Sequence, residues 1–219
     1  MIELYGHPFS SYTWKVLIAL YENDTPFTFR MTGPDQPDNE AVLARDWLPG
    51  KFPLLVDDGR PVPESSAIIE HLDRHHPGAV RFVPADPALA AEVRLLDRVF
   101  DNQVMGHMQA IVAEHLPFIT ASPDPNRVAR ARDALDQAYR WLDARLAGRR
   151  WAAGDDFTLA DCAGAPSLFY ADWVHPIDAR FAAVKAYRAR VLARPSVTRC
   201  VDEARPYRHF FPLGAPDRD

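Results

Sequence analysis

The spacing of apolar residues along the chain changes character near Pro84. Before that point, short runs of strand-forming residues alternate with segments whose apolar positions recur every three or four residues, as on one helix face. The pattern predicts strands at 2–5 and 26–31, a loop at 34–40, a hairpin over 52–62 that turns at Asp58-Gly59, and helices ending at Asn23, over 40–46 and from Ser65 to 76. The predicted element order is therefore βαβαββα.

Beyond Pro84 the alternating strand pattern does not return, and the apolar spacing is helical throughout. Breaks rich in proline, glycine and aspartate separate the segments, which predicts helices over 87–116, 126–146, 158–173, 179–193 and 195–204. The fold class follows as α/β plus all-α. Residues 1–78 form the first domain, 79–86 the linker and 87–219 an all-helical domain.

Composition narrows the possible functions. The chain has 219 residues, 47% of them apolar, which is enough for one or two packed cores. A net charge of −5 provides no basic surface for nucleic acid. No apolar run approaches the roughly 18 residues of a membrane span, so we expect a cytoplasmic protein without a membrane partner. Cys162 and Cys200 lie in no metal-binding or disulfide pattern.

Two adjacent serines, Ser10 and Ser11, stand where the first apolar run gives way to the first helical pattern. Serine at such a place usually caps the helix, because its side-chain oxygen accepts a hydrogen bond from a free backbone N–H. A hydroxyl at the positive end of a helix dipole can also lower the pKa of a bound thiol, by donating a hydrogen bond to the thiolate. The residues alone leave both interpretations open.

Other polar residues favour structural roles. Thr158 and Asp161 have the spacing of a capping box ahead of an apolar helix. His75 and His76 end a helix, where they complement its dipole. No Ser-His-Asp or Cys-His set emerges from the spacing, so packed or solvated histidine is expected for all eight, and no metal site is predicted.

Four segments in order carry the clearest signal: SSYTWKVLIAL near the start, PGKFPLLVDDGRPVPESSAIIEHL at 49–72, GDDFTLADC at 154–162 and RPSVTRCVDEAR at 194–205. With them, the chain resembles the cytosolic glutathione transferase superfamily over nearly its whole length. The resemblance implies a thioredoxin-like first domain, glutathione as co-substrate without a metal, and a homodimer. The serine stretch is most similar to the zeta class, which has Cys where this chain has Tyr12.

The resemblance also implies how the thiol end of glutathione binds. Ser10 matches the hydroxyl that activates the thiol, with Ser11 as the alternative. Pro53 begins a strand that its missing N–H disfavours, which a cis bond would explain. In the superfamily a cis-proline here lets the preceding residue, Phe52, pair its backbone with the cysteinyl portion.

The two ends of glutathione would bind elsewhere. Ser65 stands at the first turn of a helix, where free N–H groups suit a carboxylate, and Glu64 suits the ammonium of the γ-glutamyl group. The loop at 32–40 is acidic and offers no cation for the glycine carboxylate. This leaves Lys51, with Gln36 as the alternative.

The resemblance implies that the second substrate binds in a pocket formed by the loop after the first strand, the long fourth helix and the sixth helix. By resemblance, its candidate residues are His7, Tyr12, Met105, Met108, Gln109 and Tyr170. Methionine and aromatic side chains suit adaptable apolar substrates. The two methionines are also spaced like a core stripe, so at least one of them is expected in the core.

The predicted function is a Ser-type glutathione transferase, in which the stabilised thiolate attacks a small apolar electrophile, as in detoxification. Two alternatives remain. One is a glutathione-dependent cis-trans isomerase of the zeta (maleylacetoacetate isomerase) kind. The other is a non-catalytic binding domain of the same fold.

Overall fold

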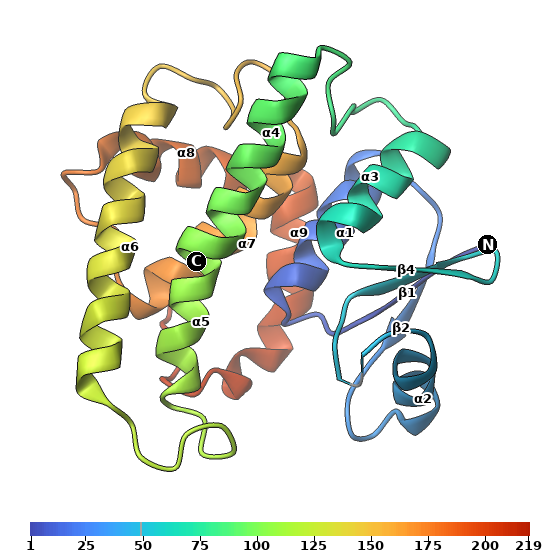
Figure 1. The fold of residues 1–219 in the computed structure, drawn as a ribbon, viewed down its shortest axis with the longest axis horizontal. Helices are drawn as coiled ribbons and strands as arrows, with labels where there is room; N and C mark the ends of the chain where they lie inside the picture. The colour runs from blue at the N-terminus through green and yellow to red at the C-terminus, as the bar shows by residue number, and fades with distance from the viewer. Residues whose placement is uncertain (49) are drawn as a thin grey trace.

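The N-terminal part of the chain has the predicted βαβαββα order. The computed structural model describes residues 1–48 and 50–219. Its first elements are β1 (Ile2–Gly6), α1 (Ser11–Glu22), β2 (Thr28–Met31), α2 (Pro37–Asp46), β3 (Leu54–Asp57), β4 (Arg60–Pro63) and α3 (Ser65–His75). The only residue outside the described ranges, Pro49, is the first of the 49–72 segment. Figure 1 shows this part beside the helical remainder.

The four strands form one mixed sheet in the order β2-β1-β3-β4. β1 and β2 are parallel, with Glu3 opposite Thr28, whereas β1 and β3 are antiparallel, with Leu4 opposite Leu55. β3 and β4 form the predicted hairpin, in which Leu55 faces Val62. The parallel pair requires a crossover, and α1 provides it.

Side chains of the sheet alternate between two apolar layers. Leu4 and Leu55 belong to the main core, together with α1 and α3. Tyr5 and Leu54, one position away on the same strands, pack with Leu43 of α2 in a smaller core. This period of two is the one expected for a sheet covered by helices on both faces.

The rest of the chain is helical, as predicted. It contains α4 (Pro87–Val99), a π-helical segment (Phe100–Met105), α5 (Gly106–Ala113), α6 (Pro125–Leu146), α7 (Leu159–Val174), α8 (Ala182–Leu192), α9 (Pro195–Ala204) and a 3₁₀ helix (Arg205–Phe210). α1 packs against both α7 and α9. Its fully buried Trp14 places its ring centroid 4.9 Å from that of Phe169 on α7. One core thus joins the two parts.

The capping box at the start of α7 is confirmed. The backbone N–H of Thr158 donates to Asp161 Oδ2 at 2.8 Å, and the hydroxyl of Tyr187 donates to Oδ1 at 2.8 Å. The N–H of Ala152 also donates to Oδ1, at 2.8 Å. Asp161 is completely buried, so this carboxylate organises the helical core and takes no part in a site.

Three predicted boundaries were wrong near the ends of elements. α2 begins at Pro37 and not at Glu40, so half of the predicted loop is helical. Proline is tolerated in a first helical turn, where no N–H is needed, and acidic residues there complement the dipole. β2 begins at Thr28, and α8 begins at Ala182.

The long helix predicted over 87–116 is also corrected. α4 passes into the π-helical segment Phe100–Met105, and α5 ends at Ala113. The terminal 3₁₀ helix was not predicted at all. Single π turns are frequent at functional sites and leave no clear mark on apolar periodicity.

Both cysteines are free and buried, which agrees with the absence of a disulfide pattern. Among the residues that the structure describes, no helix is both long and apolar enough to cross a membrane.

Candidate active site

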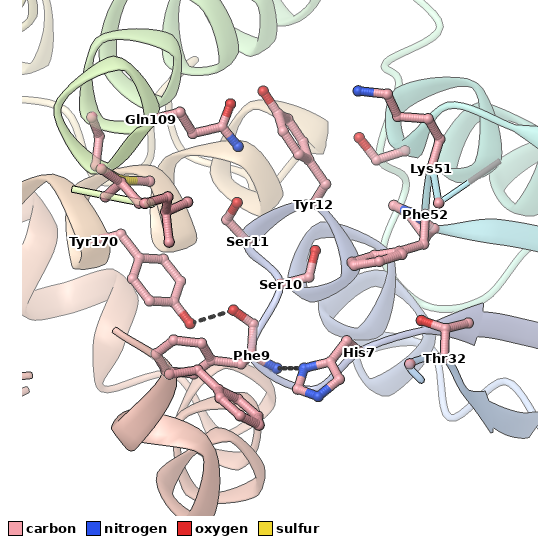
Figure 2. A pocket seen from close by; sticks show the side chains of 18 of the residues that line it. His7, Phe9, Ser10, Ser11, Tyr12, Thr32, Lys51, Phe52, Gln109 and Tyr170 are labelled. Carbon is pink, nitrogen blue, oxygen red and sulfur yellow. Dashed lines mark hydrogen bonds between the residues drawn. The ribbon is translucent and has the colours of Figure 1, made fainter. Parts of the chain in front are cut away.

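A cavity of about 1020 Å³ opens where the N-terminal ends of α1 and α3 face α5, α7 and the C-terminal segment. Every predicted site residue except Met105 and Gln36, the alternative to Lys51, lines it: His7, Ser10, Ser11, Tyr12, Lys51, Phe52, Pro53, Glu64, Ser65, Met108, Gln109 and Tyr170. Figure 2 shows ten of the cavity's residues labelled. Its volume suits a ligand of drug size.

Ser10 is the N-cap of α1, as one of the two interpretations predicted. Its backbone is extended, with φ −86° and ψ 125°, and its Oγ accepts a hydrogen bond from the N–H of Thr13 at 3.2 Å. A hydroxyl that accepts in this way keeps its own proton free to donate. Capping therefore leaves Ser10 able to hydrogen-bond an anion in the cavity.

Ser11 is the first residue of α1 and is buried. Figure 2 places its hydroxyl on the side of Gln109 and Tyr170, whereas that of Ser10 lies on the side of Phe52 and Lys51. The two serines therefore serve different regions of the cavity. Ser10 is the one that faces the residues predicted to hold the co-substrate.

The N-terminus of α3 forms a second polar region. Glu64, its N-cap, has φ 69° and ψ 116°, a left-handed backbone conformation that non-glycine residues seldom adopt. No side chain among the described residues caps this helix end, and Ser65 is buried beside the cavity. Free N–H groups and the helix dipole make such an end an anion site. Strain held at this position is typical of functional residues.

The Phe52-Pro53 peptide bond is cis, as predicted. Phe52 and Pro53 both line the cavity, and Lys51 stands exposed at its edge. Gln36, the alternative to Lys51, is not among the lining residues. Lys51 is thus the better placed of the two for an anionic group.

A buried charge network that the sequence did not reveal borders the cavity. The ammonium of Lys15, 1% exposed, lies 2.8 Å from Asp97 Oδ1, 2.7 Å from Asp101 Oδ2 and 2.9 Å from the hydroxyl of Ser66. The guanidinium of Arg98 is 2.9 Å from Asp101 Oδ2. The network joins α1 to α3, α4 and the π-helical segment. A lysine inside an otherwise apolar helical run was the one signal in the sequence.

Asp101 offers an unused acceptor at this border. Its Oδ1 is buried and has no hydrogen-bond partner among the described residues, although the side chain lines the cavity. Burial raises the pKa of Asp101 against the opposing pull of Lys15. A buried carboxylate with an unused acceptor favours a cation at this border of the cavity.

The other side of the cavity is apolar and aromatic. Tyr170, almost fully buried, donates its hydroxyl to the carbonyl of Phe9 at 2.9 Å. Burial raises the pKa of Tyr12 to about 12, so its phenol stays protonated near neutral pH. Met108 lines the cavity, whereas Met105 lies in the core at 1% exposure, which confirms that at least one methionine is a core residue.

His7 lines the cavity as an uncharged group. Burial lowers its pKa, and its Nδ1 accepts a hydrogen bond from the N–H of Phe9 at 3.1 Å. Its ring also meets that of Tyr207 edge-on, with centroids 4.8 Å apart. The neutral tautomer therefore carries its proton on Nε2.

Further lining residues were missed by sequence reasoning. They follow β2, lie within or after α5, or belong to the C-terminal segment: Thr32, Val112, Leu116, Phe118, Phe210, Phe211 and Pro212. Phe118 is 83% exposed. These segments are remote in sequence from the motifs, so no local pattern could have assigned them.

Comparison with known proteins follows the same division of the chain. Residues 4–79 match the family model described as glutathione S-transferase, N-terminal domain, and residues 125–190 match glutathione S-transferase, C-terminal domain. The chain thus has a thioredoxin-like domain followed by a helical domain, with a cavity at the N-terminus of α1, which is the architecture of glutathione transferases. The chain belongs to the glutathione S-transferase family.

Individual relatives cover most of the chain. Glutathione S-transferase-like protein LUC7 of a Fusarium species is 36% identical over 169 residues, 73% of this chain and 74% of that protein. FtsZ-localized protein A of Caulobacter vibrioides is 28% identical over 202 residues, 88% of this chain and 87% of that one. A glutathione S-transferase structure from Methylobacillus flagellatus KT, solved with glutathione bound, has a TM-score of 0.78 at 22% identity, covering 91% of this chain and 98% of that chain.

Proposed function

We propose that this protein is a Ser-type glutathione transferase, which binds glutathione along Ser10, Phe52 and Ser65. The thiolate of the bound glutathione attacks an apolar electrophile in the same cavity. One observation carries the proposal. A single cavity brings together two helix N-termini, one with a free hydroxyl proton, and an aromatic wall. This arrangement suits a ligand with a thiol at its centre and charges at its ends.

The chemistry assigned to Ser10 is stabilisation of the thiolate. A free thiol has a pKa of about 8.5 and is mostly protonated near neutral pH. A hydrogen bond from the Ser10 hydroxyl and the positive end of the α1 dipole both favour the anion. The thiol proton leaves to solvent, the sulfur forms a bond to carbon, and the leaving group departs with its electron pair. Holding both reactants in one cavity adds proximity.

The γ-glutamyl end of glutathione fits the region around α3. Its carboxylate would accept hydrogen bonds from the free N–H groups at Ser65. Its ammonium would lie near Glu64 and the carboxyl group of Asp101, both of which line the cavity. The glycine carboxylate would reach Lys51 at the cavity edge. The γ-glutamyl end, which carries both charges, would thus meet a helix N-terminus and carboxylates, and the anionic glycine end would meet a cation.

Conjugation is favoured over two related functions. In the zeta-type reaction, the thiolate would add reversibly to a cis double bond and leave again after rotation. Tyr12, which lines the cavity, stands where that class has a cysteine. The other alternative is a binding protein without turnover. One relative, FtsZ-localized protein A, is named for its localisation and not for an enzymatic activity. A homodimer and a cytoplasmic location remain predictions.

The experiment is an ultraviolet titration of the thiol of bound glutathione in the wild type, Ser10→Ala, Ser10→Asp and Ser11→Ala. Aspartate is a good N-cap, but its ionised carboxylate can only accept, so Ser10→Asp keeps the helix cap and removes the donor. We expect the wild type to lower the thiol pKa by at least about one unit, and both Ser10 variants to lose this shift. In the same two Ser10 variants, the turnover of glutathione with an aryl halide should fall about 100-fold.

Each other outcome has a distinct meaning. An unshifted thiol in the wild type, with glutathione bound, would favour the binding protein. Loss of the shift in Ser11→Ala alone would transfer the role to Ser11. Faster isomerisation of a cis-alkene than conjugation of the aryl halide would favour the zeta-type reaction.

A further inference from the structure

A cluster of two histidines and a carboxylate lies at the end of α3 remote from the proposed glutathione site. The Nε2 atom of His71 is 2.9 Å from Oδ2 of Asp57, and the Nε2 atom of His76 is 2.7 Å from the same oxygen. The three potential ligand atoms all lie within 4.8 Å of one another. The sequence predicted no metal site, because the cluster exists only once α3 packs on β3.

The hairpin fixes the position of the carboxylate. Asp57 is the last residue of β3 and pairs with Arg60 of β4. The two residues of the turn, Asp58 and Gly59, have φ values of 48° and 82°, as a tight two-residue hairpin requires. Asp57 also pairs with Ile2 of β1. Its carboxylate therefore projects from a well-anchored corner of the sheet.

The end of α3 brings the two imidazoles together. Five positions along a continuous helix place two side chains about 140° apart around the axis, so His71 and His76 would diverge. His76 is the C-cap, and its φ of −132° and ψ of 54° take it out of the helix. This departure allows its ring to turn back to the same oxygen that His71 reaches.

The chemistry of the three groups matches a transition metal. Two imidazole nitrogens and one carboxylate oxygen are a ligand set of zinc sites, in which water completes the coordination. Magnesium and calcium prefer oxygen alone. We propose that Asp57, His71 and His76 bind one Zn²⁺ or similar divalent transition-metal ion. This inference stands independently of the proposed glutathione chemistry.

Loading the site needs only a small rearrangement. Without metal, both imidazoles donate from Nε2 to Asp57. Metal binding moves each proton to Nδ1 through solvent and frees Nε2 as a ligand. Ligand atoms around a tetrahedral zinc lie about 3.3 Å apart, so each imidazole nitrogen must move roughly half an ångström away from the carboxylate oxygen of Asp57. The side chain of His76 is 32% exposed, which provides an entry for the ion and room for water.

The surroundings predict moderate affinity. Within the described part of the chain, neither Nδ1 atom has a protein acceptor, and such outer partners strengthen metal sites 10- to 100-fold. Arg60 and Arg74 line the same groove as His71 and oppose a cation. We therefore expect weaker binding than at zinc sites whose imidazoles have such outer partners. The ion would tie the end of β3 to the C-terminal turn of α3.

The test uses tag-free, chelator-treated full-length protein without glutathione. Zn²⁺ is titrated by calorimetry, and Co²⁺ is titrated by its visible absorption, for the wild type, His71→Asn, His76→Asn and His75→Asn. His75 is the matched control, since it adjoins the cluster on the same helix, with its ring centroid 4.5 Å from that of His71, but lies outside the three-ligand group. We expect one ion per chain, at least a tenfold loss in His71→Asn and His76→Asn, and a change below about threefold in His75→Asn.

Two measurements on the wild type test the proposal even if the variants fail to fold. Nitrogen-15 spectra of the imidazoles should show His71 and His76 changing to the Nδ1–H tautomer on addition of Zn²⁺, with His75 unchanged. Thermal denaturation should show the melting temperature of the wild type rising by about 5–11 °C when free Zn²⁺ is at a hundredfold excess over the dissociation constant. The proposal is overturned if a 100-fold molar excess of Zn²⁺ over the protein, without chelator, leaves the spectra and the melting temperature unchanged. It is also overturned if His75→Asn weakens Zn²⁺ binding as much as His71→Asn.

Discussion

Replacement of Lys15 by methionine tests the buried charge network that joins the two domains. Lys15 lies 2.8 Å from Asp97 and 2.7 Å from Asp101, and all three are at least nine-tenths buried. Methionine replaces the apolar stem of lysine with a chain of similar shape, but it leaves two neighbouring carboxylates without this cation. Removing one partner of a buried ion pair costs about 3–5 kcal/mol.

Arg98 sets the size of the effect within that range. Its guanidinium lies 2.6 Å from Asp97 and 2.9 Å from Asp101, but half of its side chain is exposed, so solvent screens its charge. We therefore expect the lower end, a loss of about 3 kcal/mol in the free energy of unfolding. For a chain of this length, the melting temperature should fall by about 6–12 °C.

The loss should also depend on pH in a defined direction. Burial already raises the pKa of Asp101 in the folded protein, and removal of the cation raises it further. A carboxyl whose folded pKa is raised contributes stability that is present at low pH and lost as pH rises through the folded pKa. The deficit of Lys15→Met should therefore be largest near pH 7.5 and smaller near pH 5.5.

The assay is urea unfolding followed by tryptophan fluorescence at both pH values. Lys185→Met is the matched control, because Lys185 is exposed on α8 and should change stability by less than about 0.5 kcal/mol. Adding Asp97→Asn to Lys15→Met should restore part of the loss, because Arg98 can pair with the remaining Asp101. A deficit below about 1 kcal/mol at pH 7.5, or one that grows on acidification, would refute this account.

Two further predictions concern packing and binding. Gly164→Ala would place a Cβ 2.6 Å from the hydroxyl of Tyr187, so urea unfolding should show a loss of about 1–3 kcal/mol, whereas Gly106→Ala, with only an ordinary 3.5 Å contact, should not be destabilised. Equal stability of the two variants would contradict this packing. Lys51→Ala should weaken glutathione binding about two- to fivefold in calorimetry, less at high salt, because an exposed ion pair is screened. A loss that is insensitive to salt would count against a charge interaction with the glycine carboxylate.

The sequence predicted those parts of the site that depend on local pattern. The N-cap position of Ser10 follows from a serine ahead of an apolar-periodic helix, and the capping box of Thr158 follows from its spacing to Asp161. The cis bond before Pro53 needed the family resemblance, because most X-Pro bonds are trans. These features involve neighbours in the chain, or a motif that carries its structure with it.

Features that depend on distant residues were beyond such reasoning. Lys15 meets Asp97 and Asp101 across 82 and 86 positions, and no periodicity marks a pairing of that separation. The π-helical segment that carries Asp101 has the composition of ordinary helix. The pocket assignment of Met105 failed for a related reason, since three-residue spacing does not say which of two helix faces meets the core.

The position of Ser10 depends on both domains at once. The backbone just before it is held from two sides: Trp14 of α1 donates its indole N–H to the carbonyl of Pro8 at 2.6 Å, and Tyr170 of α7 donates its hydroxyl to the carbonyl of Phe9 at 2.9 Å. A capping hydroxyl could sit on any isolated helix, but its direction into the cavity requires this loop to be fixed. The helical domain thus contributes to the proposed thiolate site without touching the thiol. This explains why the serine motif alone could not distinguish a cap from a catalytic group.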